Sequence, residues 1–157
     1  MNEISQSNNL TLPGKIIVYL DEIRVVLPGT QALLGFQLVA AFSFGFDRIS
    51  ILFKYMHILS LLLVSISVIL LLIPPAFHRI AEHGQDTHRL HVLTTKVIMV
   101  AMASLGLGLA VDLFVVVSVI LQSVLVGTIV AVGIAFLCVL FWYIYPLSNR
   151  VSRIENK

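Results

Sequence analysis

The residue with the strongest chemical requirements is Asp112, because it stands in an otherwise apolar run over residues 97–121. An ionised carboxylate in the hydrocarbon of a bilayer is costly, so such groups are found paired, hydrated or protonated. Three residues elsewhere in the chain are candidate partners: Gln37, Arg48 and Lys54. The sequence therefore marks Asp112 as the first candidate functional residue.

Two positions for Asp112 remain open. Counted from Leu121, the carboxylate lies nine residues into its apolar run, about 13 Å along a helix axis, which places it inside the bilayer. If the third helix instead spans residues 92–112, the carboxylate lies at the outer interface and an interfacial turn follows it. We favour the interfacial position, although the apolar run up to Leu121 supports the other.

Four of the five histidines fall in a polar loop, residues 74–96, between two apolar runs. Imidazoles and carboxylates are common metal ligands, but only His88 and His91 have the spacing of a helical ligand pair. We therefore expect no dedicated metal site. Titration near neutral pH is an alternative role, and a solvated loop facing anionic headgroups is the interpretation we favour. The other candidate functional residues of the loop are His78, Arg79, Glu82 and Asp86.

Two apolar runs carry uncharged polar residues or histidine. His57, Ser60 and Ser67 lie on one stripe if residues 51–73 are helical. Gln31 and Gln37 stand six residues apart, so they do not share a helix face. We expect each glutamine to form an interhelical hydrogen bond.

Small residues four apart mark faces at which helices approach closely in lipid. Ser104 and Gly108 lie on the same ridge as Asp112, and a second ridge combines Gly127, Ala131 and Ala135. We expect these ridges to pack the helices of one bundle. The alternative is that they line a hydrated path or bind a partner subunit.

No combination of residues indicates a catalytic site. No serine or cysteine lies near a plausible base in the sequence, and no phosphate loop or cofactor motif is present. His57 and His91 belong at opposite faces of the membrane, so they are not expected to ligate one haem. We therefore predict that the protein is not an enzyme and holds no cofactor.

The composition limits the class of protein. Of the 157 residues, 59% are hydrophobic and 11% are charged, whereas an average soluble domain has about 25% charged residues. The mean hydropathy is +1.02. A single cysteine excludes an internal disulfide, and a net charge of +2 is too small to indicate a nucleic-acid partner. The chain is therefore expected to be an integral membrane protein in contact with the lipid bilayer.

Four apolar runs reach the roughly 20 residues that a membrane-crossing helix needs. They cover residues 28–46, 51–73, 97–121 and 124–147, and Pro74 and Pro75 are expected to end the second. The predicted fold is an all-α integral membrane four-helix bundle. It forms a single domain over residues 15–147, with a flexible polar N-terminus at 1–14 and a basic cytoplasmic tail at 148–157.

Residues 15–27, which precede the first span, have apolar residues at helical spacing interrupted by charges. The predicted fold includes this segment as a short amphipathic helix in the membrane interface, turning into the span at Pro28 and Gly29. A cytoplasmic extension of the first span fits the same pattern equally well.

Lysines and arginines predict the orientation, because they are enriched on the cytoplasmic side. Eight of the ten lie in the N-terminal segment, the central loop and the tail, and two, Arg48 and Lys54, lie on the other side. Both termini and the central loop are therefore predicted to be cytoplasmic. The N-terminus lacks the features of a signal peptide, so no cleavage is expected.

Four stretches carry a resemblance to a known family: LDEIRVVLPGTQALLGFQL at residues 20–38, PPAFHRI at 74–80, EHGQDTHRLH at 82–91 and GLGLAVDLFVVV at 106–117. Over residues 18–146 the chain resembles a bacterial family of small four-span membrane proteins of unknown function. The resemblance implies a bacterial origin and a four-helix fold in the inner membrane, but no particular activity. The residues that match its motifs are Arg24, Pro28, Gly29, Gln31, Phe36, Gln37, His78, Arg79, Glu82, Gly84, Asp86, Thr87 and Asp112.

Three functional hypotheses remain. In the first, the chain forms a homo-oligomeric channel or small transporter whose route is lined by Asp112, Gln37 and the stripe of His57, Ser60 and Ser67. In the second, it is an accessory or scaffold subunit of a larger membrane complex. In the third, the loop histidines sense pH or ions. We favour a non-enzymatic membrane protein that self-associates and takes part in ion or small-solute transport.

Overall fold

The computed structural model describes residues 12–80 and 88–148, with side chains over 21–80 and 92–148. Every regular element in these ranges is helical. The long helices are α2 (Leu12–Ala41), α3 (Ile51–Ile80), α4 (His88–Ile120) and α5 (Val124–Val139). A short 3₁₀ helix, η2 (Phe46–Arg48), lies between α2 and α3, and a π-helical turn, η3 (Leu140–Ile144), continues α5. The predicted all-α four-helix bundle is confirmed.

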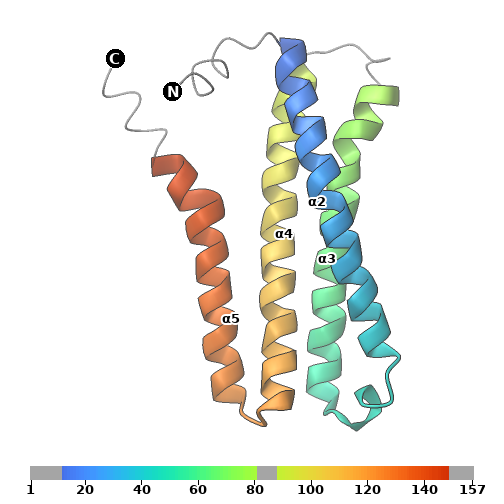
Figure 1. The fold of residues 1–157 in the computed structure, drawn as a ribbon, viewed down its shortest axis with the longest axis vertical. Helices are drawn as coiled ribbons and strands as arrows, with labels where there is room; N and C mark the ends of the chain where they lie inside the picture. The colour runs from blue at the N-terminus through green and yellow to red at the C-terminus, as the bar shows by residue number, and fades with distance from the viewer. Residues whose placement is uncertain (1–11, 81–87, 149–157) are drawn as a thin grey trace.

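Four helical stretches are long and apolar enough to cross a membrane: Asp21–Ala41, Ile51–Ile80, Val92–Ile120 and Val124–Ser148. Successive helices run in opposite directions, so both short connections lie at one end of the bundle (Figure 1). We call this the hairpin end, and we call the opposite end, from which α2 starts, the terminal end. The helices α3 and α4 form the most extensive pair, α2 packs across both, and α5 stands beside α4.

The first helix has no break at Pro28, because α2 is a single helix that contains this residue. The separate interfacial helix of the predicted fold is therefore wrong, and the alternative, an extension of the first span, is what the structure has. A proline inside a helix removes one amide donor. Packing compensates, since Ile23, one turn earlier, is buried against Leu71 of α3 and Ala101 of α4.

The second helix also continues past the prolines that were expected to end it. Pro74 and Pro75 lie inside α3, which runs on to Ile80. Their rings leave the carbonyls of Leu70 and Leu71 without the usual amide partner four residues on. Helix interiors tolerate this in membrane proteins when neighbouring helices hold the segment. Here Leu71 and the buried Pro74 face the other helices of the bundle.

The third helix begins at His88, directly after Asp86 and Thr87, which lie outside the described residues. It remains helical for eight residues beyond Asp112. The predicted interfacial turn after Asp112 is therefore wrong. The physical reason is packing, because Val115 and Ser118 on this last stretch are 5% and 2% exposed and face the neighbouring helices.

A tight turn at residues 121–123 joins α4 to α5. Gln122 adopts a positive φ of 48°, which few residues other than glycine take up. Ser123 then caps α5, since its hydroxyl accepts a hydrogen bond from the amide of Val126. The first turn of α5 is thereby directed back along α4, and Gly127 packs against α4.

Glycines let the helices approach each other. At Gly108 of α4, an added Cβ would lie 2.8 Å from Val64 Cγ2 and 3.3 Å from Leu63 Cβ, both on α3. At Gly127 of α5, it would lie 2.9 Å from the carbonyl oxygen of Phe114 on α4 and collide with Ser118. Both glycines thus pack helices of the same chain.

We predict that Gly127→Ala destabilises the bundle by about 1–3 kcal/mol, because a methyl group must be inserted into a closed contact. Gly133 on the same helix is the matched control, since nothing lies within 4 Å of its added Cβ. Gly133→Ala should be neutral or slightly stabilising. Thermal unfolding of both variants in detergent checks the difference. Equal stability of the two would contradict the packing role of Gly127.

Candidate functional site

A polar cluster lies near the hairpin end, where α2, α3 and α4 meet. Its hub is Ser60 of α3, which is completely buried. The Ser60 hydroxyl donates a hydrogen bond of 2.7 Å to the carbonyl of Gly108 on α4 and accepts one of 2.7 Å from Gln37 Nε2 on α2. One hydroxyl therefore joins three helices, and the absence of a side chain at Gly108 lets it reach the α4 backbone.

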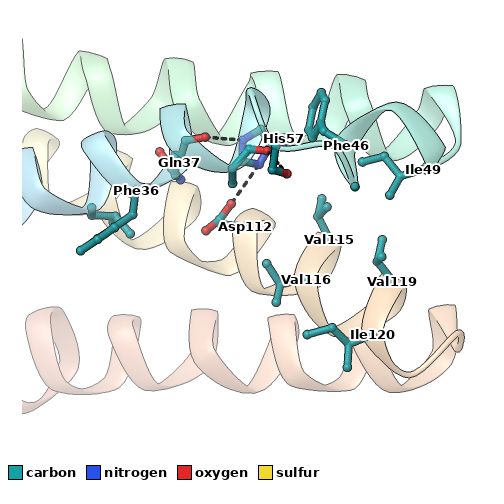
Figure 2. Close-up of a pocket in the computed structure, with 14 residues that line it drawn as sticks. Phe36, Gln37, Phe46, Ile49, His57, Asp112, Val115, Val116, Val119 and Ile120 are labelled. Atoms are coloured by element: carbon teal, nitrogen blue, oxygen red, sulfur yellow. Dashed lines mark hydrogen bonds and ion pairs between the residues drawn. The ribbon is translucent and has the colours of Figure 1, made fainter.

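One turn away on α3, the ring of His57 contacts both neighbouring helices. Its Nε2 lies 3.0 Å from the backbone oxygen of Gln37, and its Nδ1 lies 3.2 Å from Asp112 Oδ1 (Figure 2). The side chains of His57 and Asp112 are only 5% and 17% exposed. The imidazole is thus clamped between a main-chain carbonyl of α2 and a carboxylate of α4.

The contact with Gln37 determines which ring nitrogen of His57 carries a hydrogen. A carbonyl oxygen only accepts hydrogen bonds, so Nε2 of His57 carries a hydrogen. Nδ1 lies within ion-pair range of Asp112, so the two side chains form an ion pair when the imidazole is protonated.

Two acceptor atoms in the cluster remain without a hydrogen bond from any described residue. They are Gln37 Oε1 and Asp112 Oδ1, and both are buried. The Nδ1–Oδ1 distance is within ion-pair range, but the ring nitrogen is not aligned as a hydrogen-bond donor to this oxygen. Buried polar groups are ordinarily satisfied, so each unsatisfied acceptor needs an explanation.

The aromatic ring of Phe46, in η2, covers the hairpin side of His57. The two ring centroids are 5.3 Å apart in an edge-to-face arrangement. Lys54 lies beyond this ring, with Nζ 5.9 Å from its centroid and 3.2 Å from the carbonyl of Asp47. Among the described residues, the candidate partners Lys54 and Arg48 therefore do not pair with Asp112. Lys54 is engaged at the connection, and the carboxylate faces His57 instead.

A pocket of about 440 Å³ opens beside the cluster, between α2, the α2–α3 connection and α4. Gln37, His57 and Asp112 supply polar groups at one part of its wall, and Phe36, Phe46 and Ile120 are among its apolar residues (Figure 2). Phe36 and Ile120 are 74% and 71% exposed. Because these rim residues belong to spanning helices, the pocket opens sideways toward the lipid.

Toward the terminal end, the interior is filled by packed side chains. On α3, the buried positions after Ser60 are Val64, Ser67, Leu71 and Pro74, which continue the predicted stripe of His57, Ser60 and Ser67. Leu71 packs with Ile23 and Ala101 in an apolar core. The stripe thus faces the chain's own helices. Within the described residues, the polar cluster borders the pocket in the hairpin half of the bundle. The packed side chains separate it from the terminal half.

The cluster contains serine, histidine and aspartate, but they are not arranged for nucleophilic catalysis. In such a triad, the histidine nitrogen opposite the aspartate activates the hydroxyl. In this chain that nitrogen, Nε2 of His57, bonds the carbonyl of Gln37, and the Ser60 hydroxyl donates to the carbonyl of Gly108.

The remaining predicted residues lie elsewhere. Gln31 is exposed and, among the described residues, forms no interhelical bond, since six residues of helix rotate it away from Gln37. His78 is half-buried and Arg79 exposed, both near the end of α3. Ser104 donates a hydrogen bond of 2.7 Å to the carbonyl of Leu63 on α3. Ala131 and Ala135 are half-buried on α5.

Part of the predicted central loop lies outside the described residues. Glu82, Asp86 and the side chains of His88 and His91 lie outside the described residues. Among the side chains that the structure describes, no group of three or more metal-ligating residues comes together. The loop expected over residues 74–96 is much shorter, because α3 extends to Ile80 and α4 starts at His88.

The partner of Asp112 was missed by sequence reasoning, although a signal for it exists. His57 stands six residues after the start of α3 and Asp112 eight residues before the end of α4. The start of α3 and the end of α4 both lie at the hairpin end, so similar distances from that end place both side chains at a similar depth. Depth along each helix identifies the pair better than the charge of the flanking loops does.

The fold and the cluster together define a four-helix membrane protein with a buried polar site at the junction of three helices. A family model matches residues 15–146, and the chain belongs to that family, the family of unknown function DUF6328. Comparisons with curated proteins and with solved structures give no match.

We predict that Ser60→Ala destabilises the bundle by about 1–3 kcal/mol, because it leaves Gln37 Nε2 without its acceptor in a buried site. Ser65→Ala is the matched control, since the Ser65 hydroxyl bonds only the carbonyl of Leu61 in its own helix and its loss should cost less than about 0.5 kcal/mol. Denaturant unfolding in mixed micelles measures both. A Ser60 variant as stable as the Ser65 variant would show that the hub is dispensable.

A second prediction concerns the hydrogens of His57. We expect ¹⁵N NMR of the ring to show a hydrogen on Nε2 in every protonation state, with Nδ1 either protonated or accepting from Asp112. The His57→Gln variant assigns the signals among the five histidines. A neutral ring that carries its hydrogen on Nδ1 alone is incompatible with the hydrogen bond to Gln37. It would contradict the assignment of a hydrogen to Nε2.

Proposed function

We propose that this chain is a non-enzymatic component of ion or small-solute transport that binds a proton at the His57–Asp112 pair. The observation that carries the proposal is this pair itself, buried 3.2 Å apart beside an apolar pocket. Ionisable residues inside membrane spans are expensive and are retained mainly where they move protons, ions or substrates. The hydrogen-bonding pattern at Ser60 and His57 argues against an enzyme.

We further propose that the chain works as a self-associated assembly. Ile23, Leu71 and Ala101 separate its polar cluster from the terminal end, so the described residues of one copy form no continuous polar route. The helix α5 packs against α4 and leaves most of its own apolar surface uncovered, with Ile129, Val132 and Phe136 at least 60% exposed. This surface supports contact with another copy or with lipid.

The proposed location is a bacterial inner membrane, with both termini in the cytoplasm. The basic residues of the described chain support this orientation. Arg24, Arg79 and Lys96 lie toward the terminal end, and Arg48 and Lys54 lie at the hairpin end. With the cationic tail and loop counted from the sequence, the terminal end has the excess that marks the cytoplasmic side.

Proton flux tests the transport proposal. In liposomes with an imposed pH gradient and a clamped membrane potential, we expect the wild-type chain to collapse the gradient faster than protein-free liposomes do. Asp112→Asn should lower the rate to that of protein-free liposomes, because it removes the carboxylate of the pair while keeping its shape. Asp21→Asn, at an exposed residue paired with Arg24, should behave as wild type.

A gradient that decays equally with and without protein would contradict transport. The particle used must also be weighed in mild detergent with the detergent contribution removed. A small multiple of 17.3 kDa is expected for a self-associated assembly. A heavier particle that contains other chains would favour the accessory-subunit hypothesis instead.

A further inference from the structure

The pocket beside the polar cluster has the size and character of a ligand site. Its volume of about 440 Å³ lies within the range of roughly 300–1,000 Å³ that is usual for small-molecule pockets. Such sites are largely apolar with a few convergent polar groups. Here the polar groups come from three helices, as Gln37, His57 and Asp112, and the apolar lining comes mainly from α2 and α4.

The two unsatisfied buried polar atoms in the described lining of the pocket are both acceptors. Gln37 is 2% exposed, and its Oε1 has no hydrogen bond from the described residues, while its Nε2 is already used on Ser60. Asp112 Oδ1 is likewise buried without a hydrogen bond. Both residues line the pocket. A molecule that fits this site therefore has to bring hydrogen-bond donors.

The route into the pocket selects for a molecule that enters from the bilayer. Its rim includes Phe36, Val116 and Ile120, which are 74%, 41% and 71% exposed on the spanning helices. Aromatic rings of Phe36 and Phe46 line the same space, and aromatic faces attract cations. These walls suit an alkyl or aryl chain that carries a positively charged, donating head.

The charged groups around the site leave room for such a head. On α3, Lys54 is engaged with the carbonyl of Asp47, and His57 already faces Asp112. In the connection, Asp47 and Arg48 are exposed. The described part of α2 facing the pocket, and the whole of α5 as described, contain no charged side chain at this level. The carboxylate of Asp112 is thus the one formal negative charge in the lining of the pocket.

We propose that this pocket binds a single-chain lipophilic amine in its protonated form, with Asp112 Oδ1 and Gln37 Oε1 accepting its N–H groups. The inference rests on the proposed function and names the substrate class of the same site. Binding exchanges one cation for one proton. The ammonium takes the place of the proton that the proposed function assigns to the His57–Asp112 pair, that proton leaves to solvent, and His57 is then neutral with its hydrogen on Nε2. The net charge of the site is unchanged, which a low-dielectric environment favours.

Decylamine is a suitable probe, because its amino group is protonated at neutral pH as that of lysine is. Titrated as its salt into the purified full chain in neutral micelles and weak buffer, it should bind saturably and release about one proton per bound amine. Protein-free micelles correct for partitioning. Asp112→Asn should weaken binding about tenfold to hundredfold, as expected for the loss of a charged hydrogen bond. Asp21→Asn, the exposed carboxylate control, should bind as wild type does.

Two comparisons within the wild-type chain keep the proposal falsifiable even if the Asp112 variant does not fold. Decyltrimethylammonium has the charge but no N–H group, and decanol has a donor but no charge. Both should bind at least about tenfold more weakly than decylamine. Equal binding of either molecule, or saturable binding of decylamine without proton release, would overturn the assignment.

The outcome is separable from that of the transport proposal. Amine binding with proton release, together with a pH gradient that the protein does not collapse, supports the amine site and contradicts transport. A collapsed gradient that depends on Asp112, together with no saturable amine binding, supports transport and contradicts the amine site.

Discussion

Polar groups inside a membrane-spanning bundle have no bulk water as a hydrogen-bond partner, so they must pair with other groups of the protein. This constraint organises the hairpin half of the molecule. Ser60 satisfies a carbonyl on one neighbouring helix and an amide on another. The ring of His57 hydrogen-bonds the carbonyl of Gln37 on α2 and lies 3.2 Å from the Asp112 carboxylate on α4. Because hydrophobic burial contributes little between helices in lipid, these side chains and the close approach at Gly108 hold α2, α3 and α4 in register at this level.

Much of the fold follows from composition and spacing. Continuous apolar runs indicated the four helices, and the heptad-like stripe of His57, Ser60 and Ser67 is the buried face of α3. The predictions that were wrong applied a local sequence rule at positions where tertiary packing decides the backbone conformation. Proline rules predicted an end at Pro74 and a turn at Pro28, but contacts around Leu71 and Ile23 outweigh the lost backbone bonds. Local sequence carries no information about such contacts.

The residues of the candidate site could be predicted from the sequence, but the contacts between them could not. Asp112, Gln37, His57 and Ser60 were all singled out, because polar residues in apolar runs are unusual. Which of them touch depends on how three helices are rotated about their axes. Gln31 illustrates this, since it has the same chemistry as Gln37 and points away from the bundle.

The consecutive prolines of α3 have a mechanical consequence. A helix resists bending because each turn is tied to the next by parallel hydrogen bonds, and Pro74 and Pro75 delete two adjacent ties. The stiffness of α3 is therefore unevenly distributed along its length. The final turn to Ile80 is therefore tied to the part of α3 that carries His57 and Ser60 by fewer backbone hydrogen bonds than usually join successive turns of a helix.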